Sequence, residues 1–296
     1  MTASRPFVVG VDGSPSSTCA VRWAAETASR HHAPLLLLSS WSISVAAYGG
    51  VGVPQSLFDD EEADGKRRLV EAAETAREAV PDAEFSVSTA LVPGRAIEAL
   101  IDRSKDARMV VLGSRGRGEF AGGLLGSVTS ALAHHAHCPV AVIHERPSPT
   151  ETAALGPVVV GVDGTASSAS AVGVAFEQAS LRGADLVAVH AWSDVTLATF
   201  SPHDEGLPWV SIDTAEQAAL AESLAGWKEQ YPDVGVSTVV VQDRPVRNLL
   251  SYAETAMLLV VGSRGRGGFA SMLLGSTSTA LLHAVECPLM IVHSTH

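Results

Sequence analysis

Short apolar runs recur along the chain at intervals that suit strands separated by helices. In its first half, the predicted strands are Phe7–Val11, Leu35–Ser39, Phe85–Ala90, Met109–Leu112 and Val140–His144. Helical segments fill the gaps between them. Ser14 and Pro15 supply a cap and a first-turn proline to the first helix, and Pro81 closes a helix predicted over Glu61–Val80. The order of strand, helix and strand predicts an α/β protein.

The second half of the chain repeats the first. The run FVVGVDGS at Phe7–Ser14 returns as VVVGVDGT at Val158–Thr165, and VVLGSRGRG at Val110–Gly118 returns as LVVGSRGRG at Leu259–Gly267. A period this long indicates duplication of a whole domain rather than a solenoid. We expect one domain over residues 1–146, a linker over 147–156 that is rich in Pro, Ser and Thr, and a second domain over 157–296.

Each copy is expected to form a doubly wound domain with a five-stranded parallel sheet, which is a Rossmann-like fold. Right-handed crossovers place helices on both faces of such a sheet. If the strand order is 3-2-1-4-5, strands 1 and 4 are neighbours, and a crevice opens at their carboxyl ends. The glycine-containing turns after Val11 and Leu112 both follow these strands, so both should line the crevice. The final strand of each copy is predicted at a sheet edge, and pairing between the copies would cover it.

Composition narrows the possible partners. The formal net charge of −12 disfavours binding to nucleic acid, and the apolar stretches are far shorter than the roughly 18 residues of a membrane span. The three cysteines lie far apart, and the chain shows no secretory leader. We therefore expect a soluble cytoplasmic protein without disulfides.

A glycine motif supplies the candidate chemistry. Gly113 and Gly116 are followed, after nine residues, by Gly126 and Ser127, and the second copy keeps the same spacing from Gly262. The first two glycines are expected to allow a positive φ and close approach of the backbone to a ligand. The third opens a helix whose N-terminal N–H groups can hold a phosphate. No lysine follows as in a Walker loop, and the turn after strand 1 lacks the dinucleotide spacing.

Charged residues accompany the motif. Arg115 and Arg117, with Arg264 and Arg266 in the second copy, can add charged hydrogen bonds to an anion. Asp12 ends the first strand at the crevice. Its carboxylate suits ribose hydroxyls, a base edge or a phosphate-bound Mg²⁺, and these alternatives stay open.

With this motif matched in full by both copies, the chain resembles tandem universal stress proteins of the actinobacterial, ATP-binding type over nearly its whole length. The resemblance implies that each copy binds one ATP. It further implies that Gly10 and Gly161 lie next to the nucleotide, and that Asp12 and Asp163 are required for binding. It also implies homodimers. The expected function is a nucleotide-dependent regulatory module in stress adaptation, acting on an unknown protein partner, with ATP and Mg²⁺ as ligands.

The candidate ligand-binding residues follow from the motif and the resemblance together. In the first copy they are Gly10, Asp12, Gly113, Ser114, Arg115, Gly116, Arg117, Gly118, Glu119, Gly126 and Ser127. In the second copy they are Gly161, Asp163, Asp194, Gly262, Ser263, Arg264, Gly265, Arg266, Gly267, Gly268, Gly275, Ser276 and Thr277.

The copies differ in ways that bear on the two sites. Asp194 stands where the first copy has Ile43, so only the second copy offers a carboxylate there. Asp243 replaces Gly94, which leaves the role of that turn in the second copy open. The long segments Trp41–Phe58 and Trp192–Val210 are interpreted either as lids or contact surfaces, or as plain surface loops.

Two other kinds of chemistry are suggested by residues near the motif or in the same copy. His134, His135 and His137 beside Cys138 suggest a metal site, but the second copy has Ala284 and Glu286 in place of two of the histidines, which favours surface and packing roles. Asp12 as a base towards water would make the protein a slow ATPase or phosphotransferase. No repeated His or Lys partner accompanies Asp12, so binding without fast turnover is the favoured interpretation.

Overall fold

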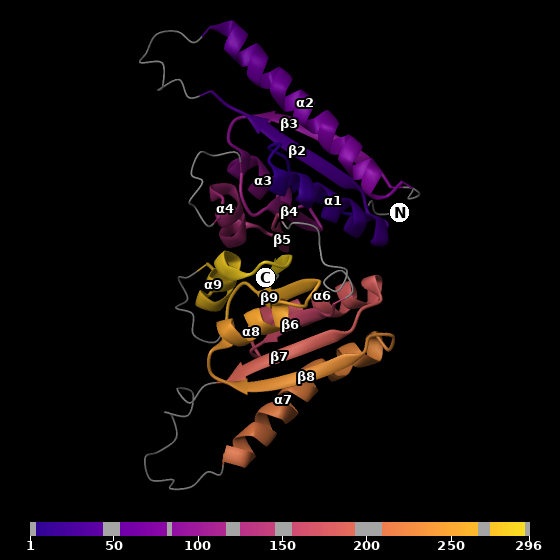
Figure 1. Ribbon diagram of the computed structural model, residues 1–296, viewed down its shortest axis with the longest axis vertical. Coiled ribbons are helices and arrows are strands. Elements are labelled where there is room, and N and C mark those ends of the chain that lie inside the picture. Colours follow the sequence, from indigo (N-terminus) through magenta and orange to yellow (C-terminus); the bar gives the residue numbers. More distant parts are fainter. Residues whose placement is uncertain are drawn as a thin grey trace. The chain divides into compact units, whose positions relative to one another are not determined.

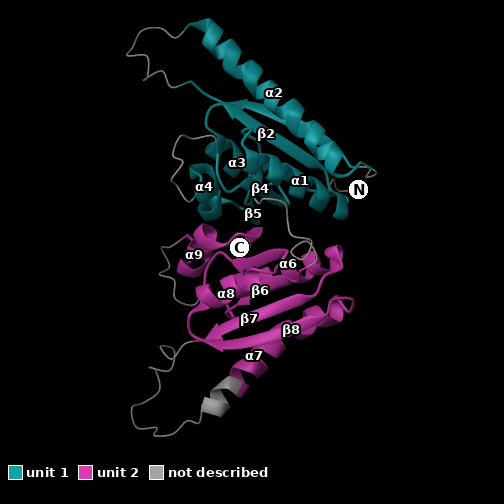
Figure 2. Cartoon of the chain, viewed as in Figure 1, with its two compact units in different colours: residues 1–145 teal, residues 146–296 magenta. Residues whose placement is uncertain are grey.

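A computed structural model of the chain describes residues 4–43, 54–81, 85–116, 125–145, 156–192, 209–265 and 273–293, with the side chains of 209–213 left out. The chain divides into two compact units, residues 1–145 and 146–296 (Figure 2). Most of the predicted linker lies outside the described residues.

Unit 1 alternates strands and helices along the chain (Figure 1). Its elements are β1 (Phe7–Gly10), α1 (Pro15–Arg30), β2 (Leu35–Trp41), α2 (Gln55–Ala79), β3 (Val87–Pro93), α3 (Ala96–Ser104), β4 (Met109–Gly113), α4 (Ser127–His135) and β5 (Val140–Ile143).

Unit 2 repeats this order. Its elements are β6 (Val158–Val162), α6 (Ala166–Arg182), β7 (Leu186–Trp192), α7 (Trp209–Gln230), β8 (Val236–Gln242), α8 (Pro245–Ala253), β9 (Leu258–Gly262), α9 (Ser276–Ala284) and β10 (Leu289–Val292).

The predicted fold is confirmed in both units. The strands of unit 1 lie in the order β3-β2-β1-β4-β5 and those of unit 2 in the order β8-β7-β6-β9-β10, and the strand pairs within each unit are parallel. Right-handed crossovers in this order put the first two helices on one face and the last two on the other. The contacts agree, since α1 packs against α2 and α3 packs against α4.

The core consists mainly of strand residues that are buried on both faces of the sheet. Every residue of β5 and of β10 is buried, and so are the first four residues of β4. Continuous burial of this kind explains why the strands appear in the sequence as unbroken apolar runs rather than as alternating patterns.

Local signals place the start of the first helix in each unit. Ser14 accepts a hydrogen bond from the backbone N–H of Ser17, with Pro15 in the first turn of α1, as predicted. Thr165 caps α6 in the same way. These side chains satisfy N–H groups that a helix start otherwise leaves without partners.

Several predicted boundaries are wrong, most of all those of α2 and β3. Helix α2 begins at Gln55 rather than Glu61, and β3 covers Val87–Pro93 rather than Phe85–Ala90. The strand extends because Leu91 and Val92 pair with the end of β2. Proline can close it because β3 is an edge strand, where a missing N–H leaves no sheet hydrogen bond unmade.

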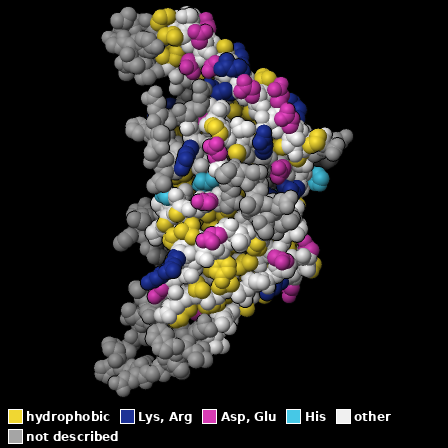
Figure 3. Space-filling model, in the orientation of Figure 1, with side chains coloured by type: hydrophobic (Ala, Val, Ile, Leu, Met, Phe, Trp, Pro, Cys, Tyr) yellow, Lys and Arg dark blue, Asp and Glu magenta, His cyan; other side chains and the backbone are white. Residues whose placement is uncertain are grey.

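The described surface carries both signs of charge. On the face shown in Figure 3, acidic and basic side chains are interspersed over the described residues. Within the described part of the chain, none of the helices is both long enough and apolar enough to cross a membrane.

Candidate functional site

The central prediction, that strands 1 and 4 lie side by side, is confirmed in both units. Phe7, Val8 and Val9 of β1 pair with Met109, Val110 and Val111 of β4, and β6 pairs with β9 in the same manner. Parallel neighbours end at the same edge of the sheet. The turn after β1 and the glycine motif after β4 are therefore adjacent.

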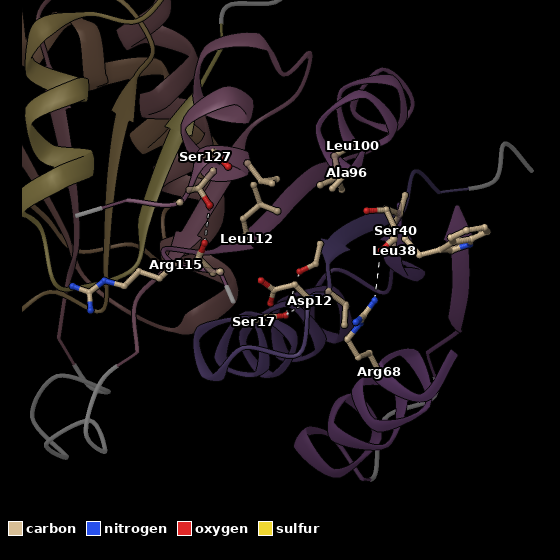
Figure 4. Close-up of a pocket in the computed structure, with 18 of the residues that line it drawn as sticks. Asp12, Ser17, Leu38, Ser40, Arg68, Ala96, Leu100, Leu112, Arg115 and Ser127 are labelled. Carbon is tan, nitrogen blue, oxygen red and sulfur yellow. Dashed lines mark hydrogen bonds between the residues drawn. The ribbon is translucent and has the colours of Figure 1, made fainter. Parts of the chain in front are cut away.

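A cavity of about 990 Å³ opens at this edge of unit 1 (Figure 4). Its walls come from the ends of β1, β2 and β4 and from the helices α1, α2, α3 and α4. Its lining includes Gly10, Val11, Asp12, Ser17, Leu38, Ser40, Trp41, Ser42, Glu61, Asp64, Arg68, Ala96, Leu100, Leu112, Gly113, Arg115, Gly116, Leu125, Gly126, Ser127, Val128 and Thr129. A cavity of this size is within the range that holds small-molecule ligands.

A tight turn orients the carboxylate of Asp12. Its Oδ1 accepts hydrogen bonds from the backbone N–H of Ser14 at 2.9 Å and from the Ser14 hydroxyl at 2.7 Å. Gly13 between them has a φ of +80°, a conformation that glycine adopts without strain. Asp163 makes the same two bonds with Thr165, at 3.0 and 2.7 Å.

The second glycine of the motif lies against this carboxylate. A Cβ added to Gly116 would lie 2.8 Å from Oδ2 of Asp12, and one added to Gly265 would lie 2.6 Å from Oδ2 of Asp163. Residues about a hundred positions apart in the sequence are thus brought into contact at the edge of each sheet, as the strand order requires.

The expected positive φ of the first two motif glycines is wrong. Within the described residues, glycines with a positive φ are Gly13, Gly94, Gly164 and Gly183. Gly113 is needed for space instead, because a Cβ there would lie 2.6 Å from Oγ and 2.7 Å from the backbone carbon of Ser16. The close packing of β4 against the start of α1 excludes a side chain at this position.

The third glycine begins helix α4 and leaves the helix start open. Gly126 is the N-cap residue, and neither α4 nor α9 has a side-chain capping bond. The Gly126 N–H itself donates to the carbonyl oxygen of Ser114 at 2.8 Å. A Cβ on Gly126 would lie 3.5 Å from that oxygen and 3.6 Å from the Gly116 nitrogen, so it would point into the space enclosed by the motif.

Some of the remaining predicted site residues line the cavity and others do not. Gly10, Arg115 and Ser127 line the cavity, whereas Ser114 is buried with its N–H bonded to Ile143. The carbonyl oxygen of Arg115 accepts a hydrogen bond from the Ser16 hydroxyl. The following predicted residues lie outside the described part of the chain: Arg117, Gly118, Glu119, Asp194, Arg266, Gly267 and Gly268.

The glycine motif of unit 2 follows the same strand and precedes the same helix as in unit 1, but some of its hydrogen bonds differ. The N–H of Arg264 donates to Ser167 Oγ at 3.3 Å. The N–H of Gly275 donates to the carbonyl oxygen of Ser263 at 2.7 Å, and Ser276 begins α9 with Thr277 after it. Gly161 and Gly262 lie in the adjoining strands β6 and β9.

Sequence reasoning missed the contribution of α2. Glu61, Asp64 and Arg68 line the cavity, and Arg68 is only 11% exposed. They recur at intervals of three and four residues, which puts them on one face of a helix. That spacing was visible in the sequence, but nothing there showed which face of α2 points to the sheet edge.

The two units differ beside the site. His190 of β7 is buried, with Nδ1 2.7 Å from the carbonyl oxygen of Val162 and Nε2 2.7 Å from Oε2 of Glu216 on α7. The turn before α8 also differs, since Asp243 and Arg244 have φ values of +54° and +53° where unit 1 has Gly94 at +104°.

The histidines near Cys138 do not gather around a common point. Nδ1 of His134 lies 2.7 Å from the carbonyl oxygen of Ser130 on its own helix. Among the described residues, no three His, Cys, Asp or Glu side chains are placed to hold a metal. Burial raises the pKa of the Cys138 thiol to about 12, so the side chain is a neutral core group.

Comparison with known proteins identifies relatives along the whole chain. The universal stress protein family matches residues 4–144 and again residues 155–293. Universal stress protein Rv2005c of Mycobacterium tuberculosis (strain ATCC 25618 / H37Rv) is 44% identical over 289 residues, or 97% of each protein. Universal stress protein Rv2623 of the same strain is 40% identical over 294 residues, covering 99% of this chain and 98% of the relative.

The solved structures agree on the fold. A universal stress protein from Archaeoglobus fulgidus DSM 4304 has a TM-score of 0.71 to this chain and 18% sequence identity, with 99% of this chain and 97% of that chain covered. Both units have the strand order and the glycine motif described above, and family matches span each of them. The chain therefore belongs to the universal stress protein family, as a tandem of two such domains.

Proposed function

We propose that each unit binds one ATP at the carboxyl edge of its sheet, and that the protein is a nucleotide-dependent regulatory module in stress adaptation. The observation that carries the proposal is the open helix start at Gly126, which faces the glycine motif and the Asp12 turn and recurs at Gly275. An uncapped helix N-terminus offers N–H donors and a positive dipole end to an anion.

The contrast between helices within each unit supports a phosphate site. Helices α1 and α6 satisfy their first N–H groups with Ser14 and Thr165, whereas α4 and α9 begin with glycines that have no side chain to do so. At those glycines, a Cβ would occupy the enclosed space. The residues present therefore fit a phosphate group held by backbone N–H groups.

Charge around the cavity fits a nucleotide with an accompanying cation. Arg115 and Arg68 line the cavity together with Asp12, Glu61 and Asp64. Arg115, which lies within the glycine motif, attracts phosphate, and the carboxylates suit Mg²⁺ or ribose hydroxyls. Because the whole chain carries a net charge of −12, this local balance has to operate at short range.

Equilibrium dialysis with variants of the full chain tests the proposal. The unchanged protein is expected to hold two ATP per chain, Gly126→Val and Gly275→Val one each, and the double variant none. Valine suits these positions because both glycines have ordinary extended backbone angles, and a Cβ would lie no closer than 3.5 Å to any other residue that the structure describes.

Gly226→Val serves as the matched control. A Cβ on Gly226 would meet no atom of the described residues within 4 Å, and Gly226 lies on α7 away from the motif, so nucleotide retention should stay at two per chain. Absence of any bound adenine nucleotide from the unchanged protein would refute the proposal.

We further propose that turnover is slow. The described residues that line the cavity include neither His nor Lys as a proton-transfer partner for Asp12. Multiple-turnover phosphate release should therefore be far below about 1 s⁻¹, the lower range of ordinary enzymes. A rate at or above that value would favour an ATPase or phosphotransferase that uses the same sites.

A further inference from the structure

Arg68 of α2 extends along the wall of the unit 1 cavity. Its aliphatic stem covers the aspartate turn, because a Cβ on Gly13 would lie 3.1 Å from Cδ of Arg68. Its head reaches β2, where Nη2 lies 3.5 Å from the carbonyl oxygen of Ser40. Nη1 lies 3.9 Å from Oδ2 of Asp64. The guanidinium is therefore held between α2 and the end of β2.

The guanidinium keeps donors that its neighbours do not use. Its Nε is buried and has no hydrogen-bond partner among the described residues. The Nη contacts at 3.5 and 3.9 Å are longer than ordinary hydrogen bonds of about 2.7–3.2 Å. Because Arg68 lines the cavity, the loosely held Nη N–H groups are the donors that an acceptor on a bound ligand would take.

The sheet order shows which part of a ligand Arg68 would meet. Strand β1 lies between β2 and β4, so the Ser40 end of β2 is two strand spacings, roughly 10 Å, from the glycine motif. In Figure 4, Arg68 and Ser40 lie across Asp12 from Arg115 and Ser127. A nucleotide with its phosphates at the motif would bring its nucleoside towards Arg68.

Unit 2 has no equivalent arginine. Val80-Pro81 after α2 corresponds to Tyr231-Pro232 after α7, and this register aligns Arg68 with Ala219. It also aligns Leu69 with Leu220, and both leucines are buried. Alanine has no side-chain donor, so Ala219 cannot make the contact that Arg68 offers in unit 1.

We propose that Arg68 recognises an acceptor atom on the nucleoside of the nucleotide in unit 1, either a ribose oxygen or a purine ring nitrogen. Unit 2, with Ala219, binds its nucleotide without this contact. The inference rests on the proposed ATP binding and deepens it. The nucleoside then contributes more to the nucleotide affinity of unit 1 than to that of unit 2.

Calorimetric titration of the full chain tests the proposed role of Arg68. All variants of unit 1 carry Gly275→Val, so that only unit 1 binds nucleotide and its Kd alone is measured. Arg68→Met keeps the stem over Gly13 and removes the donors. We expect the Kd for ATP to rise about tenfold, which corresponds to about 1.4 kcal/mol. The Kd for inorganic tripolyphosphate should change less than about twofold, because it reaches only the motif.

Two further variants sharpen the result. Arg77→Met removes one positive charge from the exposed part of the same helix and should leave both Kd values unchanged. Arg68→Lys keeps a charge but lacks the planar fork, so it should weaken ATP in the same direction and guards against loss of folding in Arg68→Met. With 2′-deoxyATP, a smaller effect of Arg68→Met identifies the ribose 2′-oxygen as the contact, and an undiminished effect assigns the contact to another ribose oxygen or to the base.

The reciprocal change is Ala219→Arg with Gly126→Val in the background, which should strengthen ATP binding to unit 2. Equal weakening of ATP and tripolyphosphate by Arg68→Met, or no weakening of ATP, would overturn the inference while leaving ATP binding itself intact. Failure of the unchanged chain to bind ATP would instead overturn the proposed function, and the role of Arg68 with it.

Discussion

Glycine serves three separate physical purposes around the site. Gly13 supplies a positive φ for the aspartate turn, Gly113 gives room for the start of α1, and Gly126 leaves a helix start open. Replacement of each should therefore have a different result. A side chain at Gly113 would strain the packing of β4 on α1, typically by about 1–3 kcal/mol, whereas one at Gly126 would fill only the enclosed space.

Burial of the Cys138 thiol should make the stability of the protein depend on pH. The pKa of this thiol rises from 9.0 to about 12 on folding through desolvation. Between these values the unfolded chain loses the proton and the folded chain keeps it, so the free energy of unfolding falls as the pH rises. Between pH 8 and pH 10.5, the free energy of unfolding of the unchanged protein should fall by about 2 kcal/mol more than that of the Cys138→Ala variant.

Urea unfolding of both proteins at each pH measures this difference. Cys19→Ala is the control, because Cys19 is less buried and should show a smaller difference. Parallel pH profiles for the unchanged protein and Cys138→Ala would contradict the prediction.

At the scale of elements, one polar contact joins β7 to α7. The Val162 carbonyl oxygen can only accept, so Nδ1 of His190 donates to it. Nε2 then faces Oε2 of Glu216 at 2.7 Å, and a proton has to lie between the two atoms for a hydrogen bond. Because His190 is buried beside the residue that precedes Asp163, this contact also supports the turn of the unit 2 site.

We predict that Glu216→Ala lowers the free energy of unfolding of unit 2 by about 1–3 kcal/mol, since it leaves a buried ring nitrogen without a partner. Glu216→Gln should recover most of the loss, because an amide N–H can donate to a neutral imidazole. Urea unfolding followed by tryptophan fluorescence provides the measurement. Glu222→Ala, at an exposed position of α7, is the matched control, and an equal loss there would argue against a specific pair.

At the scale of the whole molecule, duplication has kept one backbone plan and changed the side chains beside it. The strand order, the aspartate turn and the open helix start recur, whereas Arg68 and His190 each belong to one unit. If both units bind nucleotide as proposed, the different surroundings of the two sites would let one chain respond to nucleotide over a wider range of concentration than two identical sites.

We also propose that the chain assembles as a homodimer, as the family resemblance implies. Light scattering of the purified protein should give a mass of twice the 30.7 kDa of one chain. The mass should persist on dilution if the interface is a stable one. A mass of one chain at all concentrations would refute the dimer.

Much of the site could be predicted because its signals are local. The apolar runs of β1 and β4, the cap at Ser14 and the repeated glycine spacing are all read over a few residues. The roles of the glycines could not be predicted in the same way. Whether Gly113 is needed for its φ or for space depends on Ser16, which reaches it only through the fold.

By itself, the sequence determined the duplication, the α/β class and the strands that bear the motif, since periodicity and spacing are properties of the chain alone. The tertiary structure decided what each motif residue touches and which helix completes the cavity. Arg68 illustrates the reason. The sequence shows that α2 has polar and apolar faces, but only the packing of α2 on β2 decides that the Arg68 side chain lies at the sheet edge. Contacts between distant segments depend on that packing, which no local pattern encodes.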